Sequence, residues 1–199
     1  MAPPLILASG SAIRAQLLTQ ACIPYEVIKP RVDEDMIKQA LLAEGAPPRD
    51  IADALAEMKA RKISEKHPGG LVLGCDQVLD HRGTLLSKPK DPADAVAQIT
   101  GLNNDRHALL SAAVIYEDGK PIWRHVGQVR LRMRELSETY IADYVARNWD
   151  SIQYAVGCYK LEEEGVRLFS RIEGDYFTVL GMPLLELINY LTLRGDLAK

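Results

Sequence analysis

The fold is decided by the stretch Leu71-Val72-Leu73-Gly74-Cys75-Asp76-Gln77-Val78-Leu79, an apolar run that a carboxylate and an amide interrupt near its end. An apolar run of this length is typical of a strand that is buried on both faces of a sheet. A buried charge costs several kcal/mol unless it is paired or bound to a metal. Asp76 must therefore have a compensating partner, or it must lie where the strand opens into a site.

Cations follow this strand within the reach of one hairpin. The downstream run Leu86-Ser87-Lys88-Pro89-Lys90-Asp91-Pro92 places Lys88 on a loop that proline constrains. An acid and a lysine brought together in this way suggest chemistry on an anionic substrate. For Lys88 itself, a phosphate contact and a solvated loop position are both open.

Composition indicates an ordinary globular protein. The 199 residues are 47% hydrophobic and 26% charged with a net charge of −3, which fits one domain over 1–199 or two small lobes and gives no reason to expect nucleic acid as a partner. Cys22, Cys75 and Cys158 are widely spaced with no CxxC pair, a pattern typical of reduced thiols. Leu5 to Ala8 is too short for a signal segment, and no apolar stretch reaches membrane-spanning length. We expect a cytoplasmic protein with no membrane partner.

Helices and strands alternate along the chain without an internal repeat or a low-complexity linker. The pattern predicts an α/β fold with a mixed, partly antiparallel sheet. The expected strands cover 5–8, 25–28, the run from 71, 108–116, 122–133 and a glycine-rich region at 156–179. The expected helices lie at 13–21 and 36–41, after an N-cap at Asp50, after Asp91-Pro92 up to Gly101, after an N-cap at Ser137, and from Pro183.

Ser9-Gly10-Ser11 lies between the first expected strand and the first expected helix. Such a turn aims backbone N–H groups and the positive end of the helix at an anion, and glycine allows the anion to approach closely. Arg14, one turn into the helix, could reach the same phosphate. The alternative is a capped helix with an arginine in solvent, because no full glycine-rich phosphate motif is present.

Val32-Asp33-Glu34-Asp35 is a group of acids ahead of a helix. Negative charge at a helix N-terminus complements the helix dipole, and this alone could explain the group. Together with Asp76, one of these acids could instead hold a hard divalent cation, since Mg²⁺ characteristically uses one or two carboxylates plus substrate phosphate oxygens.

The other charged residues have plainer interpretations. Lys59 follows the apolar face of a helix, which is typical of a surface lysine whose stem packs on the protein while its ammonium stays in water. Arg130, Arg132 and Arg134 alternate with apolar residues and lack interleaved aromatics, so we expect a solvated face of a strand rather than a nucleic-acid surface. The four histidines show no metal-ligand spacing and receive no catalytic role; they are His67, His81, His107 and His125.

Six short motifs stand in order along the chain: Leu7-Ala8-Ser9-x-Ser11-x-x-Arg14-x-x-Leu17-Leu18, Val32-Asp33-Glu34, Lys59-Ala60, Gly74-Cys75-Asp76, Lys88-Pro89, and Glu173-Gly174 before Val179-x-Gly181-Met182-Pro183. Together they resemble the Maf family of nucleoside triphosphate pyrophosphatases. The resemblance runs from Leu5 to about Leu191. No single motif is specific, but their order and spacing are.

The resemblance implies an elongated α/β fold with a central cleft, and the metal-dependent hydrolysis of a nucleoside triphosphate to the monophosphate and pyrophosphate. It implies that Asp76 is the general base that activates water, and that Glu34 holds a divalent metal such as Mg²⁺ or Mn²⁺ together with Asp76. It further implies a cradle for the triphosphate, formed by Ser9, Arg14, Lys59 and Lys88. Homodimers are common in such families.

Two departures from the family pattern bear on activity and specificity. The usual Ser-Pro-Arg-Arg is here Ser11-Ala12-Ile13-Arg14, so one phosphate-facing arginine is replaced by Ile13. A non-catalytic nucleotide-binding protein linked to cell division is therefore an alternative. Gln77 stands where many members have threonine, and its longer amide could alter recognition of the base or ribose, which makes it a candidate substrate-binding residue.

The segment around Gln77 also indicates a subgroup. Asp76-Gln77-Val78, with Tyr159-Lys160 and the 162–165 region, is similar to the subgroup that acts on 7-methyl-GTP. The other main subgroup, which acts on dTTP and UTP, usually has threonine after the aspartate. The methylated guanine nucleotide is the favoured substrate, and dTTP or UTP is the alternative.

Overall fold

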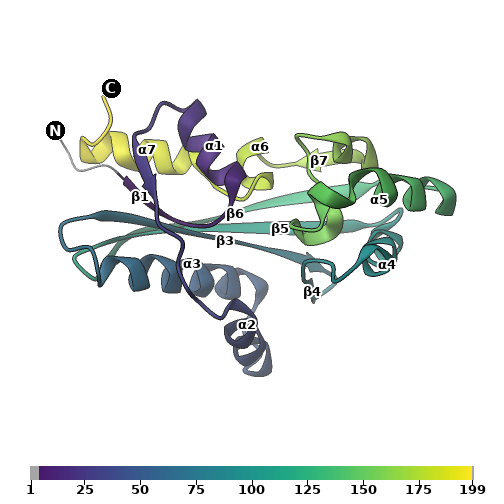
Figure 1. The fold of residues 1–199 in the computed structure, drawn as a ribbon, viewed down its shortest axis with the longest axis horizontal. Coiled ribbons are helices and arrows are strands. Elements are labelled where there is room, and N and C mark those ends of the chain that lie inside the picture. The colour runs from purple at the N-terminus through teal and green to yellow at the C-terminus, as the bar shows by residue number, and fades with distance from the viewer. Residues whose placement is uncertain (1–4, 199) are drawn as a thin grey trace. The chain divides into compact units, whose positions relative to one another are not determined.

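The computed structural model describes residues 5–198, which form a seven-stranded mixed sheet flanked by helices (Figure 1). The strand order is β2-β1-β3-β5-β6-β7, and β4 pairs with β3. β1 pairs in parallel with β2 and β3, while β4 on β3 and β7 on β6 are antiparallel. The predicted α/β fold with a mixed, partly antiparallel sheet is therefore confirmed. The strands are β1 (Leu5–Ala8), β2 (Tyr25–Val27), β3 (Leu71–His81), β4 (Thr84–Leu86), β5 (Arg106–Glu117), β6 (Lys120–Met133) and β7 (Phe169–Glu173).

The described residues also form seven α-helices, the last two of which follow β7, and two short 3₁₀-helices. They are α1 (Ala12–Gln20), α2 (Glu34–Ala43), α3 (Pro48–Ser64), α4 (Pro92–Leu102), α5 (Glu138–Ile152), η1 (Val156–Cys158), η2 (Glu164–Leu168), α6 (Tyr176–Val179) and α7 (Leu184–Arg194). None of the helices found in residues 5–198 combines the length and the apolar character that a membrane span requires. The three cysteines are free thiols, as predicted.

The chain divides into two compact units. The first contains the described residues up to Gln77, Ser111–Gly127 and those from Gly181 onward; the second contains Val78–Leu110 and Gln128–Leu180. A central cleft between two lobes stays a prediction.

In the first unit, α3 lies along one face of the strands, and α1 and α7 lie on the other (Figure 1). The packing of α3 on β3 depends on Gly74. A Cβ atom at this position would lie 2.2 Å from the carbonyl oxygen of Ala56 and 2.7 Å from the backbone nitrogen of Ala60. Because Gly74 has no side chain, the backbone of α3 packs directly on β3. This contact lies two residues before Asp76 on the strand.

The start of α3 differs from the prediction. The N-cap is Pro47 rather than Asp50, and Pro48 is the first helical residue. Proline is well suited to the first helical position, because its missing N–H would have no partner there and its fixed φ matches the helix. Asp50 lies in the first turn, where its charge still complements the helix dipole.

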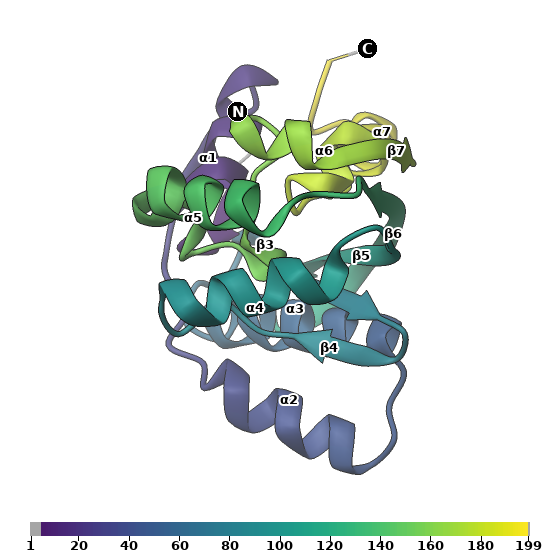
Figure 2. The same ribbon diagram turned by 90° about the vertical axis from the view of Figure 1, so that its right-hand side faces the viewer.

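In the second unit, α4 and α5 pack against each other (Figure 2). Both begin as predicted, because the Asp91 side chain accepts a hydrogen bond from the backbone of Asp94 and Ser137 accepts one from Tyr140. On β6, Arg130 is exposed while Leu131 is buried, in the alternation expected for a strand with one solvated face.

The region 156–179 is not the strand region predicted from its glycines. It forms η1 and η2, and only the short β7 is extended. Gly157 and Cys158 have φ values of +77° and +61°, which end any extended run. At Gly165, a Cβ atom would lie 2.4 Å from the carbonyl oxygen of Lys160, so the chain closes into a tight turn there.

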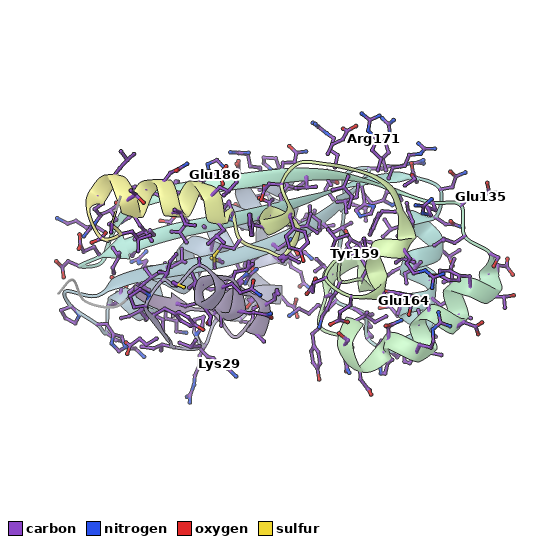
Figure 3. The ribbon with its side chains drawn as sticks, turned by 90° about the horizontal axis from the view of Figure 1, so that it is seen from above. Lys29, Glu135, Tyr159, Glu164, Arg171 and Glu186 are labelled. Atoms are coloured by element: carbon purple, nitrogen blue, oxygen red, sulfur yellow. The ribbon has the colours of Figure 1, made fainter. Side chains whose placement is uncertain are left out.

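This turn region encloses a buried histidine. His107 is 4% exposed, its Nε2 lies 2.8 Å from the hydroxyl of Tyr159 (labelled in Figure 3), and its ring also contacts Phe169. Burial lowers the pKa of His107 to about 4. Between pH 6.5 and pH 4 the unfolded chain therefore binds a proton that the folded chain does not, so stability is lost as the pH falls.

We expect the free energy of unfolding to fall by about 3 kcal/mol between pH 6.5 and pH 4 because of His107. His107→Gln, which keeps a hydrogen-bonding group beside Tyr159, should remove most of this contribution. Urea unfolding at a series of pH values measures it. The matched change His125→Gln should leave the pH dependence as it is, and an unchanged pH dependence in His107→Gln would contradict the assignment.

Candidate functional site

A buried lysine in the first unit joins two acids from different elements. Lys59 Nζ on α3 lies 2.7 Å from Asp76 Oδ1 on β3 and 2.9 Å from Glu34 Oε1 on α2. The side chains of Lys59 and Asp76 are 6% and 8% exposed, whereas that of Glu34 is 48% exposed. The partner that the buried aspartate required is therefore Lys59, and Glu34 completes the group from the solvent side.

Lys59 is not the surface lysine expected from its helical face. It shares the buried face of α3 with Ala56, Ala60 and Ile63. The long stem packs among these apolar residues, and the ammonium ends against Asp76 instead of water. The acid on the neighbouring strand decides this outcome, because it supplies a buried counter-charge that helix periodicity does not show.

Burial dominates the electrostatics of Asp76. It raises the pKa of this carboxyl above its ordinary value of 3.8, although the positive charges of Lys59 and Arg14 act in the opposite direction. A carboxylate with a raised pKa is a better proton acceptor than an exposed one. Asp76 therefore has the environment expected of a general base.

Arg14 is held by three oxygen acceptors. Its Nε donates to the carbonyl of Gly181 at 2.9 Å, and its Nη1 donates to the carbonyl of Cys75 at 3.0 Å and to Ser9 Oγ at 3.3 Å. These acceptors are neutral, so none of them compensates the positive charge of the guanidinium, which acts on Asp76. The solvent arginine considered from the sequence is thus replaced by a fixed cation.

Ser9, rather than Ser11, provides the side-chain oxygen at this turn. Ser11 is the N-cap residue of α1 but makes no side-chain capping bond. Ser9 is buried, and its Oγ accepts hydrogen bonds from the backbone of Ser11 and from Arg14. The turn thereby joins the strand end to the arginine.

Gly181 has a role that the sequence did not reveal. It adopts φ +97°, and a Cβ atom there would lie 3.2 Å from Nε of Arg14. The missing side chain lets the guanidinium reach the Gly181 carbonyl. The motif Gly181-Met182-Pro183 was visible in the sequence, but its contact with the first helix was not.

Glu34 is placed by the start of α2. Asp33 is the N-cap residue, and its Oδ1 accepts a hydrogen bond from the backbone of Met36 at 3.0 Å. Glu34 follows as the first helical residue and turns toward Lys59. The helix-terminus interpretation therefore applies to Asp33, whereas Glu34 pairs with Lys59 and its part in holding a metal stays a prediction.

Gln77 points away from the carboxylate of Asp76. Gly74 and Asp76 face α3, and successive side chains of a strand point to opposite faces of the sheet. On that opposite face, Gln77 Nε2 donates to Oγ of the buried Ser111 at 2.9 Å. Its part in substrate binding stays a prediction.

Lys88 belongs to the second unit, in the exposed segment after β4. The contact of Lys88 with a triphosphate stays a prediction. Six of the seven predicted site residues lie in the first unit, and five of these interact in or beside the charged cluster of Lys59, while Gln77 points to the other face of β3. The five are Ser9, Arg14, Glu34, Lys59 and Asp76.

Lys38 is a cation of this region that the sequence analysis missed. It is half-buried on α2, and burial lowers its pKa while the charges of Asp76 and Asp35 oppose that shift. Because Lys38 lies four residues after Glu34, the two share one face of the helix. That spacing is a signal which could have been found in the sequence.

Cys75, next to Asp76, does not act as a nucleophile in this arrangement. It is fully buried, and burial raises the pKa of its thiol to about 11. The thiolate is the reactive form of cysteine, so this side chain stays inert near neutral pH. Its contribution is the carbonyl oxygen that accepts a hydrogen bond from Arg14.

Glu34 and Asp76 are the two acids predicted to hold a divalent metal, and their carboxylates are of the type that Mg²⁺ uses. Glu34 and Asp76 already share one cation, the ammonium of Lys59. Mg²⁺ binds through one or two carboxylates and takes its other ligands from water and phosphate. Within residues 5–198, no three His, Cys, Asp or Glu side chains are grouped as metal ligands. Two carboxylates leave the remaining ligands of a metal to water and substrate, and the metal itself stays a prediction.

The family of this chain follows from a matching family model and from relatives of high sequence identity. A family model described as Maf-like protein matches residues 4–193. A nucleoside triphosphate pyrophosphatase of Roseobacter denitrificans is 71% identical over 199 residues and 100% of both chains, and one of Ruegeria pomeroyi is 72% identical over 195 residues and 98% of both. A solved nucleoside-triphosphatase / dITP/XTP pyrophosphatase from Mycobacterium abscessus aligns over 98% of this chain and 95% of its own, with 14% identity and a TM-score of 0.41. The chain belongs to the Maf family.

Proposed function

We propose that this protein hydrolyses a nucleoside triphosphate to the nucleoside monophosphate and pyrophosphate, with Asp76 as the general base. The observation that carries the proposal is the buried Asp76 carboxylate held by Lys59, with Glu34 and Arg14 beside it. The names of the relatives from Roseobacter denitrificans and Ruegeria pomeroyi support the same reaction.

In this mechanism Asp76 orients a water molecule and accepts its proton. The water oxygen forms a bond to phosphorus as the α–β phosphoanhydride bond breaks, and pyrophosphate leaves. Phosphoryl transfer depends on positioning and charge neutralisation rather than on a covalent intermediate with the protein. The raised pKa of Asp76 makes it a stronger base than an exposed aspartate.

The cations of the site neutralise the phosphates. Arg14 is fixed by its three acceptors, so it presents its charge without losing side-chain freedom on binding. Lys59 can exchange a carboxylate for a phosphate oxygen, and the contact of Lys88 with a phosphate stays a prediction from the sequence. Glu34 and Asp76 would hold a divalent metal, which supplies further charge neutralisation and polarises a phosphoryl oxygen.

The favoured substrate is 7-methyl-GTP, on the basis of Gln77, and dTTP or UTP is the alternative. A panel of canonical and methylated nucleoside triphosphates with Mg²⁺ or Mn²⁺ tests both choices. Release of pyrophosphate from one nucleotide well above the others is expected. Release of orthophosphate alone, or no turnover on any nucleotide, would contradict the proposed reaction.

The replacement of the usual arginine by Ile13 keeps a second function open, a nucleotide-binding protein without turnover. Equilibrium binding measured beside turnover separates the two. Tight binding of a nucleotide with no hydrolysis would favour the binding protein, whereas turnover excludes it.

Lys38 is proposed as a further contact for the phosphates. We expect Lys38→Met to raise KM about three- to tenfold with a smaller change in kcat, because the charge assists binding and lies off the reacting carboxylate. Steady-state kinetics of the purified variant measure the effect. Lys66→Met, at an exposed lysine of the same unit, is the control, and equal kinetics for the two variants would remove Lys38 from the site.

A further inference from the structure

We propose that Lys59 keeps the free protein from binding a divalent metal until a nucleotide arrives. Its ammonium lies between Glu34 and Asp76, the two carboxylates that a metal would share. Metal and nucleotide therefore enter together, and the metal alone binds weakly. This inference rests on the proposed function for the identity of the nucleotide, but its test uses the metal alone.

The helix that carries Lys59 places its ammonium between the two acids in the free protein. The side chain of Lys59 is 6% exposed, and α3, which carries it, packs directly on β3 at Gly74. The ammonium is within hydrogen-bond distance of both carboxylates, so each acid already commits one oxygen to it. A metal that approached these oxygens would meet a positive charge at close range.

The charge balance of the site points the same way. The buried Asp76 pairs with Lys59 and also feels the positive charge of Arg14, whose guanidinium is bonded to the carbonyl of the preceding residue, Cys75. One acid and two cations leave no uncompensated negative charge to attract a metal, and Glu34 adds one carboxylate that is half in solvent. The free site is therefore electrostatically complete without a divalent ion.

A triphosphate changes this balance. Its oxygens offer Lys59 and Arg14 new acceptors and bring several negative charges. Lys59 has a flexible stem, so its ammonium can move to a phosphate while α3 stays in place. The carboxylates of Glu34 and Asp76 are then released for the metal that accompanies the nucleotide.

The test is a titration with Mn²⁺ in the absence of nucleotide. The electron paramagnetic resonance signal of the free ion measures how much Mn²⁺ is bound. Lys59→Met is expected to bind Mn²⁺ about tenfold more tightly than the wild type, or more, because two carboxylates lose their internal cation. Lys66→Met removes the same charge at an exposed position and should change the affinity far less. Equal affinity in the wild type and Lys59→Met would overturn the proposal.

Two further variants keep the test decisive. Lys59→Gln retains a hydrogen-bonding group beside Asp76, and Mn²⁺ should raise its Tm by about 3 °C but leave the wild type unchanged. The Tm shift of Lys59→Gln tests the proposal even if Lys59→Met does not fold. Adding Glu34→Gln to Lys59→Met should abolish the gain in affinity, and a gain that persists would show that the metal binds elsewhere and overturn the proposal.

Failure of this inference is distinguishable from failure of the proposed function. A wild-type protein that hydrolyses nucleotides but binds Mn²⁺ tightly on its own overturns the inference alone. A wild-type protein that hydrolyses no nucleotide overturns the proposed function, while weak Mn²⁺ binding that tightens in Lys59→Met still supports the role of Lys59.

Discussion

Asp76→Asn is expected to lower kcat for nucleotide hydrolysis by about 10²- to 10⁴-fold, the usual contribution of a general base. The amide has the shape of the carboxylate, and its oxygen can still accept the hydrogen bond from Lys59. It cannot accept a proton from water, so the protein should stay folded and bind nucleotide while turnover is lost. Single-turnover kinetics with saturating nucleotide isolate this step.

Asp80→Asn is the matched control for this variant. Asp80 lies on the same strand, and its carboxylate accepts a hydrogen bond from the backbone of Gly83, which an asparagine can also do. Activity within about twofold of the wild type is expected for it, since surface changes of this kind have small effects. An Asp76→Asn protein with near-wild-type kcat would exclude Asp76 as the base.

Gly74→Ala is expected to destabilise the protein by about 3 kcal/mol, because the added methyl group cannot be accommodated without moving α3. The Cβ atom would overlap the carbonyl oxygen of Ala56, a backbone atom that no rotamer change can clear. A shift of α3 would also displace Lys59 from Asp76. A displacement of about 1 Å can cost about 10²-fold in rate, so activity should fall as well.

Urea unfolding and steady-state kinetics on the same samples test this prediction. Gly101→Ala in α4 is the control, because a Cβ atom there meets nothing within 4 Å. Alanine is favoured over glycine in a helix, so this variant should be neutral or stabilised by up to about 1 kcal/mol. Gly74→Ala with wild-type stability would show that the contact between α3 and β3 is looser than described.

The strand and its need for compensation could be predicted from the sequence. An apolar run with one carboxylate implied a partner for Asp76, and α3 supplies it through Lys59. The choice of that partner could not be predicted, because helix periodicity places Lys59 on the apolar face but does not say whether its ammonium turns outward. Only the position of Asp76 on the neighbouring strand decides this.

The rest of the site could not be predicted from the sequence, because it depends on contacts between segments that lie far apart along the chain. Arg14 is held by the backbone carbonyl oxygens of Cys75 and Gly181. Every residue has such an oxygen, so the residue types in the sequence do not indicate these contacts. The strand predicted over 156–179 is confirmed only at β7 and was wrong for the rest of that region for a related reason. Its glycines occupy left-handed and tightly packed positions of a compact turn, which composition alone does not distinguish from the glycines of a strand.

The most direct test of the proposed reaction is a product analysis of the wild-type protein with its best nucleotide and Mg²⁺, by ion chromatography over a full time course. The proposed reaction predicts nucleoside monophosphate and pyrophosphate in equal amounts from the first time point, and formation of both products at least about 10²-fold more slowly with Asp76→Asn. Nucleoside diphosphate with orthophosphate, or product formation that Asp76→Asn leaves unchanged, would contradict it.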